Sequence, residues 1–356
     1  MLWEMLRMFR YDAVTAKCRC LAGRLFTKDD YAALVSRGSL AEAVAWLKDT
    51  PAYSVVLDGV EPAKVHRARL EGLLETDVIN MYAKLYTFTS GAERKFLGHL
   101  LEEYEIGYLL DAIRATEYDD SMEFYRVPRF IMEHAKIDFV RIFRTDSKDE
   151  ILAALEGTEY HEILKPVLES GSTSFAGIEA EINRAYYTRL MTKYSAVFPP
   201  EERKRVREMI STKIDLMNIS CIVRLRRFAA LRAGKDRVKL DFTAVLPKLI
   251  PAFGKLKEPD IAALCGDEID IPETIGRFAG LYRKPAEMFT ERTSTGEYGS
   301  ALLYGQAKKY SNSGPSFDVV LGVLSLKKFE IDNIVYILEA LRYGMPEDEI
   351  KSAVIA

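Results

Sequence analysis

The sequence has few of the features that mark several large classes of protein. It has no run of about 18 consecutive apolar residues, the length that a bilayer-spanning helix needs. Only four cysteines are scattered over 356 residues, which is typical of a reducing compartment and excludes a disulfide scaffold. Neither sign of charge is in excess, because 50 Lys and Arg face 53 Asp and Glu. A chain so close to neutral is a poor candidate for a general nucleic-acid binder.

Recognisable catalytic motifs are also missing. The sequence contains no His-Glu-x-x-His, Gly-x-Ser-x-Gly, Gly-x-Gly-x-x-Gly or Walker A pattern, so we expect that the chain does not itself bind ATP. Cys18 and Cys20 are two positions apart, which places them on different faces of a helix and prevents them from chelating one metal ion. The histidines are well separated and are expected to be structural: His66, His99, His134 and His161. We therefore predict no catalytic residue, no cofactor-binding residue and no metal ligand.

Acidic clusters could in principle support acid–base chemistry. General acid–base catalysis needs carboxylates in a cleft with shifted pKa values. These clusters instead lie beside Lys or Arg or at helix starts, where the helix dipole and capping explain them. We expect all of them on solvated faces: Glu102, Glu103 and Glu105; Asp119 and Asp120; Asp146, Asp149 and Glu150.

What the sequence does contain is helical periodicity. Hydrophobic residues make up 48% and charged residues 29%, as in ordinary globular proteins. Apolar positions recur at steps of three and four, most clearly in the 26 residues from Phe317 to Arg342. Strand signals are weak, and proline and glycine breakers such as Pro199-Pro200 leave helices of about 12 to 28 residues.

Residues 1–11 read as the start of an amphipathic helix rather than a signal peptide. We expect an all-α protein in the cytosol or on the cytosolic side of a membrane.

The most informative feature is an internal repeat with three landmarks. A helix start with an N-cap residue and a Glu three positions later occurs at Ser39, Ser147 and Asp270, which gives spacings of 108 and 123 residues. The second landmark is a Glu–Tyr pair seven residues apart: Glu75–Tyr82, Glu179–Tyr186 and Glu297–Tyr304.

The third landmark is an acidic residue followed directly by an apolar one. The acidic residues are Glu105, Asp215 and Glu330, and the residues three positions after them are Tyr108, Asn218 and Asn333.

Three landmarks in one order, found three times, predict three related helical modules. We place them at residues 1–115, 116–235 and 236–356. A coincidence among helix-rich segments is the alternative explanation. The residues that we expect to matter structurally are those repeated: Glu42, Glu150, Glu273, Tyr82, Tyr186 and Tyr304.

A basic stretch lies at the end of the second predicted module. Residues 203–239 contain twelve Lys and Arg but only three Asp and Glu, a local balance of +9 in a chain of −3. A solvated helix face is the simplest interpretation. A docking surface for an acidic subunit is the second, and contact with nucleic acid or lipid headgroups the third.

The order of these segments resembles one known family. The stretch from Tyr11 to Tyr31 is similar to the N-terminal region of the C subunits of V-type (A-type) ATPases and ATP synthases, the counterparts of the d subunit of eukaryotic V-ATPases. Residues 39–42, 185–187, 330–334 and 342–344 are also similar to segments of that family. The resemblance covers essentially the whole chain, although extra residues precede Tyr11 and residues 236–270 are rich in proline.

The resemblance implies a fold and a role. It implies an all-α fold of three similar modules in a pseudo-threefold, funnel-like arrangement. The implied role is a non-catalytic central-stalk rotor subunit on the cytoplasmic face of the membrane. Such a subunit is a socket between the proteolipid rotor ring and the central shaft, in a complex that couples proton or sodium transport to ATP synthesis or hydrolysis. No cofactor, nucleic acid or small-molecule substrate is implied.

Two other functions are compatible with the residues alone. A free-standing helical-repeat scaffold could bind a partner in a groove. An all-α enzyme could carry a site without a recognisable motif. Co-purification and an activity measurement on the isolated chain distinguish these from a rotor subunit.

Overall fold

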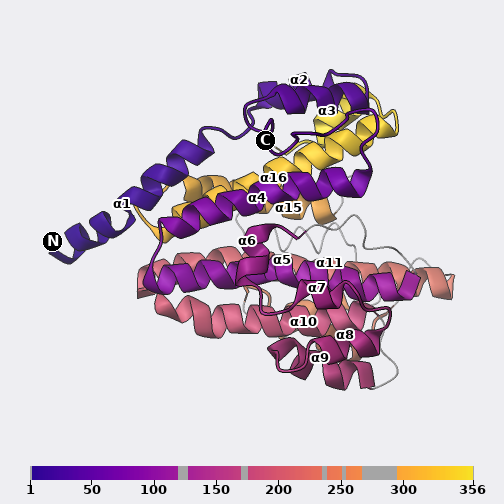
Figure 1. Cartoon of the computed structure of the whole chain (residues 1–356). Coiled ribbons are helices and arrows are strands. Elements are labelled where there is room, and N and C mark those ends of the chain that lie inside the picture. The colour runs from indigo at the N-terminus through magenta and orange to yellow at the C-terminus, as the bar shows by residue number, and fades with distance from the viewer. Residues whose placement is uncertain are drawn as a thin grey trace. The chain divides into compact units, whose positions relative to one another are not determined.

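A computed structural model describes residues 2–118, 127–169, 175–234, 239–250, 254–266 and 295–355. The chain is 76% helical, and no strand occurs among these residues, which confirms the predicted all-α class. The helices follow one another from the N-terminal to the C-terminal end as labelled and coloured in Figure 1.

The chain divides into two compact units. The first comprises residues 1–147 and 304–356, so both ends of the chain belong to it. Its helices are α1 (Leu2–Ala22), α2 (Lys28–Val35), α3 (Leu40–Asp49), α4 (Arg67–Thr87), α5 (Gly91–Tyr118), α6 (Arg129–His134), α7 (Phe139–Ile142), α16 (Phe317–Arg342) and α17 (Glu347–Ala353).

The second unit comprises residues 148–303. It contains α8 (Lys148–Ala154), α9 (Glu159–Glu169), α10 (Phe175–Arg189), a π-helix η2 (Leu190–Tyr194), a 3₁₀ turn η3 (Ser195–Val197), α11 (Pro200–Ala233), α12 (Phe242–Val245), a 3₁₀ turn η4 (Leu246–Lys248) and α13 (Glu258–Leu264). Helix α15 (Thr295–Ser311) begins in the residues of this unit and ends in those of the first. The three modules expected from the repeat are a different division of the chain and stay a prediction.

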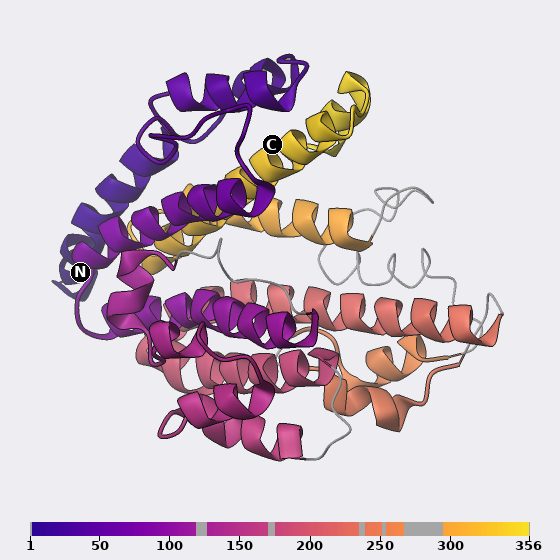
Figure 2. The ribbon, with the colours of Figure 1, turned by 45° about the vertical axis from the view of Figure 1, so that its right-hand side comes forward.

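The long helices follow from the apolar pattern. Helix α16 has the predicted bounds, and sixteen of its residues are buried, so it forms the centre of the first unit. It packs lengthwise against α1 and α4, as Figure 1 shows for α4. The expected length range was too short for α11, which runs for 34 residues from Pro200, where proline suits the first helical turn. Figure 2 shows α11 as a long ribbon that ends in salmon.

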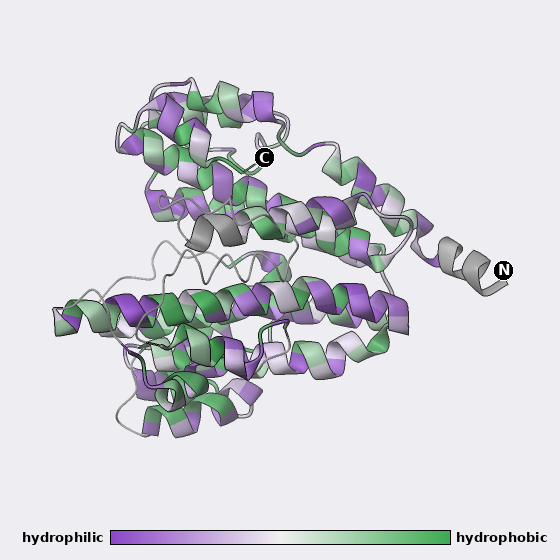
Figure 3. Ribbon diagram, turned by 180° about the vertical axis from the view of Figure 1, so that it is seen from behind, coloured by the Kyte–Doolittle hydropathy of each residue, from purple (hydrophilic) through white to green (hydrophobic). Residues whose placement is uncertain are grey.

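Each unit has its own hydrophobic core. In the first unit, side chains of α2, α3, α4, α16 and α17 surround Leu34, Leu47 and Ile334, each fully buried. In the second, one face of α11 packs against α12 and α13 through residues such as Ile222, Val245 and Leu256. In Figure 3, green and purple residues are mixed along the helices, as expected for helices with one buried face. None of the described helices combines the length and apolarity that a bilayer crossing requires.

The predicted helix starts are partly confirmed. Ser39 is the N-cap of α3, and its side chain accepts a hydrogen bond from the Glu42 amide at 3.3 Å. Helix α8 starts at Lys148, directly after Ser147. The third predicted start, at Asp270, and Glu273 lie outside the described residues.

Helices α15 and α16 lie close together at Gly322. A Cβ atom placed there would lie 2.4 Å from the Ser311 backbone nitrogen and 2.8 Å from the Ala307 carbonyl oxygen. Neither backbone atom can move away without shifting α15. Glycine is therefore required at this position by the neighbouring backbone.

We expect Gly322→Ala to destabilise the protein by about 2 kcal/mol, because the overlap outweighs the helix propensity that alanine normally adds. Gly107→Ala in α5 is the matched control, since no atom lies within 4 Å of its Cβ position. This control should be stabilising by about 0.5–1 kcal/mol. Urea unfolding of both variants measures the difference, and equal midpoints would contradict the close approach.

Candidate functional site

Three buried carboxylates lie on long helices. Glu105 of α5, Asp215 of α11 and Glu330 of α16 are 2%, 0% and 2% exposed. They are the acidic positions of the third repeat landmark. A carboxylate is stable inside a protein only when hydrogen bonds or opposite charges compensate for lost water, so the partners of these groups define what they do.

Each of these carboxylates accepts a hydrogen bond from a backbone amide that lies just before a short helix. Glu105 Oε1 is 2.8 Å from the Lys136 nitrogen, and Asp215 Oδ2 is 2.8 Å from the Lys255 nitrogen. Glu330 Oε2 is 2.5 Å from the Phe26 nitrogen. The short helices that follow are α7, α13 and α2. In all three places a long helix thus fixes the start of a short one.

The residue before each N-cap is apolar. Phe26, Ile137 and Leu256 precede the N-caps Thr27, Asp138 and Lys257, and the side chains of Ile137 and Leu256 are buried. The polar contact and the apolar side chain therefore act at the same point of each segment. Burying the apolar side chain stabilises the docked state, while the carboxylate selects one backbone position.

The asparagines of the repeat make a second, two-way contact. Asn218 donates to the Ile250 carbonyl and accepts from the Ile250 amide, both at 3.0 Å. Asn333 does the same with Ile355, at 2.8 and 3.2 Å. Tyr108, the residue at this position in the first copy, instead donates to Glu75 at 3.2 Å. The sequence match between the two asparagines therefore corresponds to one shared structural role.

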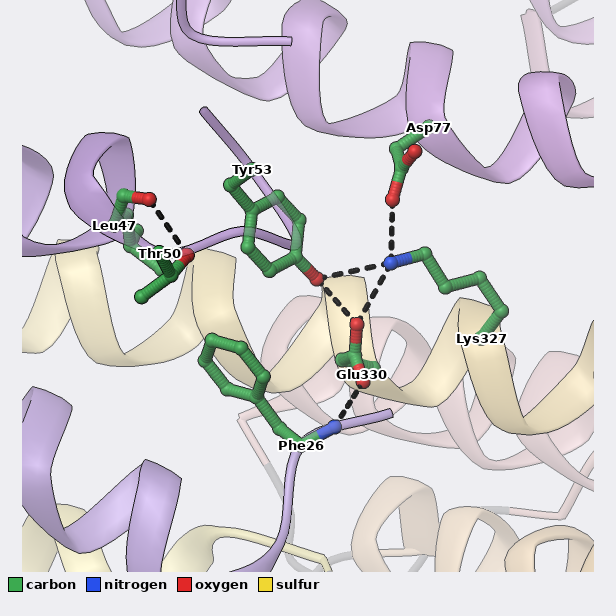
Figure 4. Close-up of polar contacts among 7 residues, drawn as sticks. All are labelled: Phe26, Leu47, Thr50, Tyr53, Asp77, Lys327 and Glu330. Carbon is green, nitrogen blue, oxygen red and sulfur yellow. Dashed lines mark hydrogen bonds and ion pairs between the residues drawn. The ribbon is translucent and has the colours of Figure 1, made fainter. Parts of the chain in front are cut away.

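Glu330 also belongs to a buried ionic cluster, drawn in Figure 4. Lys327 Nζ lies 2.5 Å from Asp77 Oδ2, 2.7 Å from Glu330 Oε1 and 3.1 Å from the Tyr53 hydroxyl oxygen. Tyr53 also donates to Glu330. The three ammonium hydrogens match these three acceptors, so Lys327 has no hydrogen left for a ligand. The cluster joins α4, α16 and the segment after α3.

Burial changes the acidity of Tyr53 in this cluster. The side chain is fully buried, which raises its pKa far above the ordinary value, and the charge of Glu330 raises that pKa further. The hydroxyl is therefore a permanent donor to Glu330. An open cavity of about 860 Å³ borders Asp77 and Lys327, but the arrangement of paired and saturated groups is that of a structural contact rather than a catalytic one.

Asp77, Lys327 and the role of Phe26 were not predicted from the sequence. A signal for Lys327 was present, because it stands between Leu324 and Ile331 on the apolar face of α16. A charged residue on such a face needs a buried partner. Nothing in the sequence indicates that the partner is Asp77, 250 positions earlier.

The expectation that Glu102 and Glu105 lie on a solvated face is wrong. Glu102 is 6% exposed, lies 2.8 Å from His99 Nδ1 and forms an ion pair with Lys136. Burial alone would raise the pKa of Glu102, but the contacts with His99 and Lys136 hold it below its ordinary value. Burial raises the pKa of Glu105 to about 7, although the hydrogen bond from the Lys136 amide lowers that pKa.

The other acidic clusters have different outcomes. Asp146, Asp149 and Glu150 are exposed as expected, while Asp119 and Asp120 lie outside the described residues.

The other predicted site residues do not converge. Among the described residues, no group of three or more His, Cys, Asp and Glu is placed to hold a metal ion. Cys18 is buried, which raises its pKa to about 12, whereas Cys20 is exposed. His134 lies 2.8 Å from the Phe130 carbonyl, and His161 lies 3.2 Å from Glu162. These contacts are local to single helices.

The repeated tyrosines each pack against another aromatic ring. The ring centroids are 5.8 Å apart for Tyr82 and Tyr104, 4.8 Å for Tyr186 and Tyr187, and 5.6 Å for Tyr304 and Phe329. Their edge-on geometry is the favourable one for aromatic pairs. The repeated Glu42 and Glu150 side chains are exposed instead.

The basic stretch divides into two parts. Three of its arginines donate to backbone carbonyls within the second unit. Arg203 reaches Ala196 and Phe198, Arg207 reaches Met191, and Arg226, which is 8% exposed, reaches Leu264 and Gly266. These arginines satisfy the carbonyl ends of neighbouring helices. Of these three only Arg226 is buried, whereas Arg203 and Arg207 are half-buried. Lys204, Arg224, Arg227 and Arg232 are exposed, as expected for a solvated face.

Comparison with known proteins gives one consistent result. Residues 14–353 match the sequence model of a family described as ATP synthase (C/AC39) subunit. A relative from Archaeoglobus fulgidus, named as the C subunit of an A-type ATP synthase, is 23% identical over 348 residues, which cover 96% of this chain and 95% of the relative. A protein of the same name from Methanocaldococcus jannaschii is 23% identical over 97% of this chain and 86% of its own length. One from Thermococcus gammatolerans is 29% identical over 63% of this chain and 60% of its own length.

We expect Lys327→Met to destabilise the protein by about 3–5 kcal/mol, because it leaves the buried Glu330 and the half-buried Asp77 without their cation. Lys328→Met is the matched control, since Lys328 is the next residue of α16 and is exposed. Adding Glu330→Gln to Lys327→Met should restore part of the loss. Chemical denaturation measures all three, and a Lys327→Met variant as stable as the control would contradict the cluster.

Glu105 should make the stability fall as the pH rises. Its pKa in the folded protein, about 7, is above the ordinary 4.5, so the folded state holds the proton more tightly. The stabilisation that this tighter proton binding gives to the folded state is fully present below pH 4.5 and is lost as the pH rises through 7. The free energy of unfolding should therefore fall by about 2–3 kcal/mol between pH 5 and 8. Glu105→Gln keeps an acceptor for Lys136 and should remove this part of the pH dependence. Glu103→Gln, at a partly exposed position, should leave it unchanged, and urea unfolding from pH 5 to 8 tests both.

Proposed function

The chain belongs to the family of ATP synthase (C/AC39) subunits, and we propose that it is the central-stalk rotor subunit of a V/A-type ATPase or ATP synthase. In this role it is an accessory subunit and not a catalytic one. It would act as a socket that couples the membrane proteolipid ring to the central shaft, peripheral to the membrane on its cytoplasmic face. The observation that carries the proposal is the family match over residues 14–353.

A subunit that transmits torque must not yield between its two interfaces. The buried carboxylates support this requirement, because breaking the contact of Glu105, Asp215 or Glu330 would leave a charge without its partner inside the protein. Packed interiors are bistable rather than continuously deformable, so such contacts hold the short helices rigidly on the long ones. At Glu330 the ion pair with Lys327 adds a second contact to the hydrogen bond from the Phe26 amide.

The order of the three contacts supports the proposed modules at residues 1–115, 116–235 and 236–356. Glu105 of the first module holds Lys136 of the second, and Asp215 of the second holds Lys255 of the third. Glu330 of the third holds Phe26 of the first. Each module therefore receives the short helices of the next, and the last receives those of the first.

We expect the full-length chain, tagged and extracted from native membranes in mild detergent, to bring down both the proteolipid ring and the shaft subunits. In cells that lack the chain, capture of the ring should no longer recover the shaft, because the proposed socket is the link between them. Mass spectrometry of the captured material measures both results.

The control is re-expression of the untagged chain, which should restore joint capture of ring and shaft. If the tagged chain elutes with neither partner, the rotor proposal fails and a free-standing helical scaffold is favoured. If ring and shaft stay together without the chain, it is not their link.

A further inference from the structure

The C-terminal end of α11 presents one continuous exposed face. Its residues follow the helical steps i, i+3, i+4, i+7 and i+8, so they lie in a single row, which we call the arginine stripe. The side chains are large: Phe228 is 58% exposed and Leu231 is 83% exposed. The stripe consists of Arg224, Arg227, Phe228, Leu231 and Arg232.

The stripe does not contribute to the core of its own unit. The opposite face of α11, which carries Ile219, Ile222 and Val223, packs against α12 and α13. After Arg226 no further residue of α11 is fully buried, and only Ala229 on the opposite face still packs against the core of the unit. These last turns are salmon in Figure 2. A solvated helix end needs no phenylalanine or leucine, and two such side chains exposed on one face are typical of an interaction site.

The charges of the stripe are not compensated within the described chain. Arg224, Arg227 and Arg232 form no ion pair with any described residue, and Arg232 instead lies over the Phe228 ring at 5.2 Å. This separates them from Arg203, Arg207 and Arg226, which are held by carbonyl oxygens. Three positive charges in a row without an acidic neighbour are complementary to a surface that carries carboxylates.

The residue types favour a protein partner over a lipid or nucleic-acid surface. All three cations are arginine, whose planar guanidinium pairs with a carboxylate through two parallel hydrogen bonds. Arginine and phenylalanine are enriched in protein interfaces, whereas lysine is depleted there. A guanidinium forms the same paired hydrogen bonds with a phosphate, so the preference for a protein partner comes from the exposed Phe228 and Leu231 among the arginines.

We propose that the arginine stripe docks into a carboxylate-lined groove on another protein subunit of the same complex, with Phe228 and Leu231 covered in the groove. This inference rests on the proposed function for the existence of that complex. A stable interface buries roughly 800 Å² on each partner, more than two helical turns supply, so the stripe is one anchor within a larger contact. Arginine and aromatic anchors of this kind carry most of the affinity of an interface.

Photo-crosslinking in the intact complex identifies what covers the stripe. A photoreactive amino acid in place of Leu231 of the full-length chain should crosslink to one other subunit, at a segment rich in Asp and Glu. The matched control is the same amino acid in place of Val55, which is 84% exposed in the first unit and should not give that product. Crosslinks to lipid, to nucleic acid or only within this chain would overturn the proposal, as would the same product from both positions.

Charge reversal tests the energetic contribution. The triple variant Arg224→Glu, Arg227→Glu and Arg232→Glu should rebind a complex prepared from cells lacking the chain at least tenfold more weakly than the wild type, with an unchanged melting temperature. The control reverses three exposed lysines away from the stripe, Lys28, Lys84 and Lys204, and should rebind normally.

The two proposals fail in different ways. If the wild type does not rebind the complex at all, the proposed function fails. If the wild type and the stripe variant rebind equally well, only the stripe proposal fails. If the stripe variant and the lysine control lose affinity equally, the effect is one of overall charge, and the docking groove is contradicted.

Discussion

Glu105, Asp215 and Glu330 stay inside the protein only while a backbone amide of a short segment donates a hydrogen bond to each. A buried carboxylate without a partner costs far more free energy than a hydrogen bond contributes. The position of each short helix is thereby tied to one turn of a long helix. At Glu330 the tie is strongest, because Lys327, Asp77 and Tyr53 are drawn into the same buried cluster.

This constraint connects the fold with the proposed role. Residue 26 near one end of the chain is held by residue 330 near the other, and of the three carboxylate contacts this one has the most ionic partners. Hydrophobic packing gives the units their stability, and the directional hydrogen bonds fix where each short segment meets its long helix. A subunit proposed to carry torque between two interfaces needs the directional kind of contact.

The basic stretch illustrates how one sequence feature can serve two purposes. Its arginines at 203, 207 and 226 complete the ends of neighbouring helices, whereas those at 224, 227 and 232 face outward beside Phe228 and Leu231. Net charge along the sequence cannot separate the two groups. The separation depends on where the last buried turn of α11 lies and on which carbonyl groups come within reach.

The sequence by itself determined the all-α class, the bounds of α16, the cap at Ser39 and the positions of the repeated acidic residues, because periodicity and capping act over one or two helical turns. It did not determine that Glu102 and Glu105 are buried, or that Lys327 meets Asp77. Whether a charged residue faces water or a partner depends on segments that are distant in sequence and meet only when the helices pack. Tertiary structure alone therefore decided which of these carboxylates are buried and hydrogen-bonded to a distant segment, and which arginines face outward among the described residues.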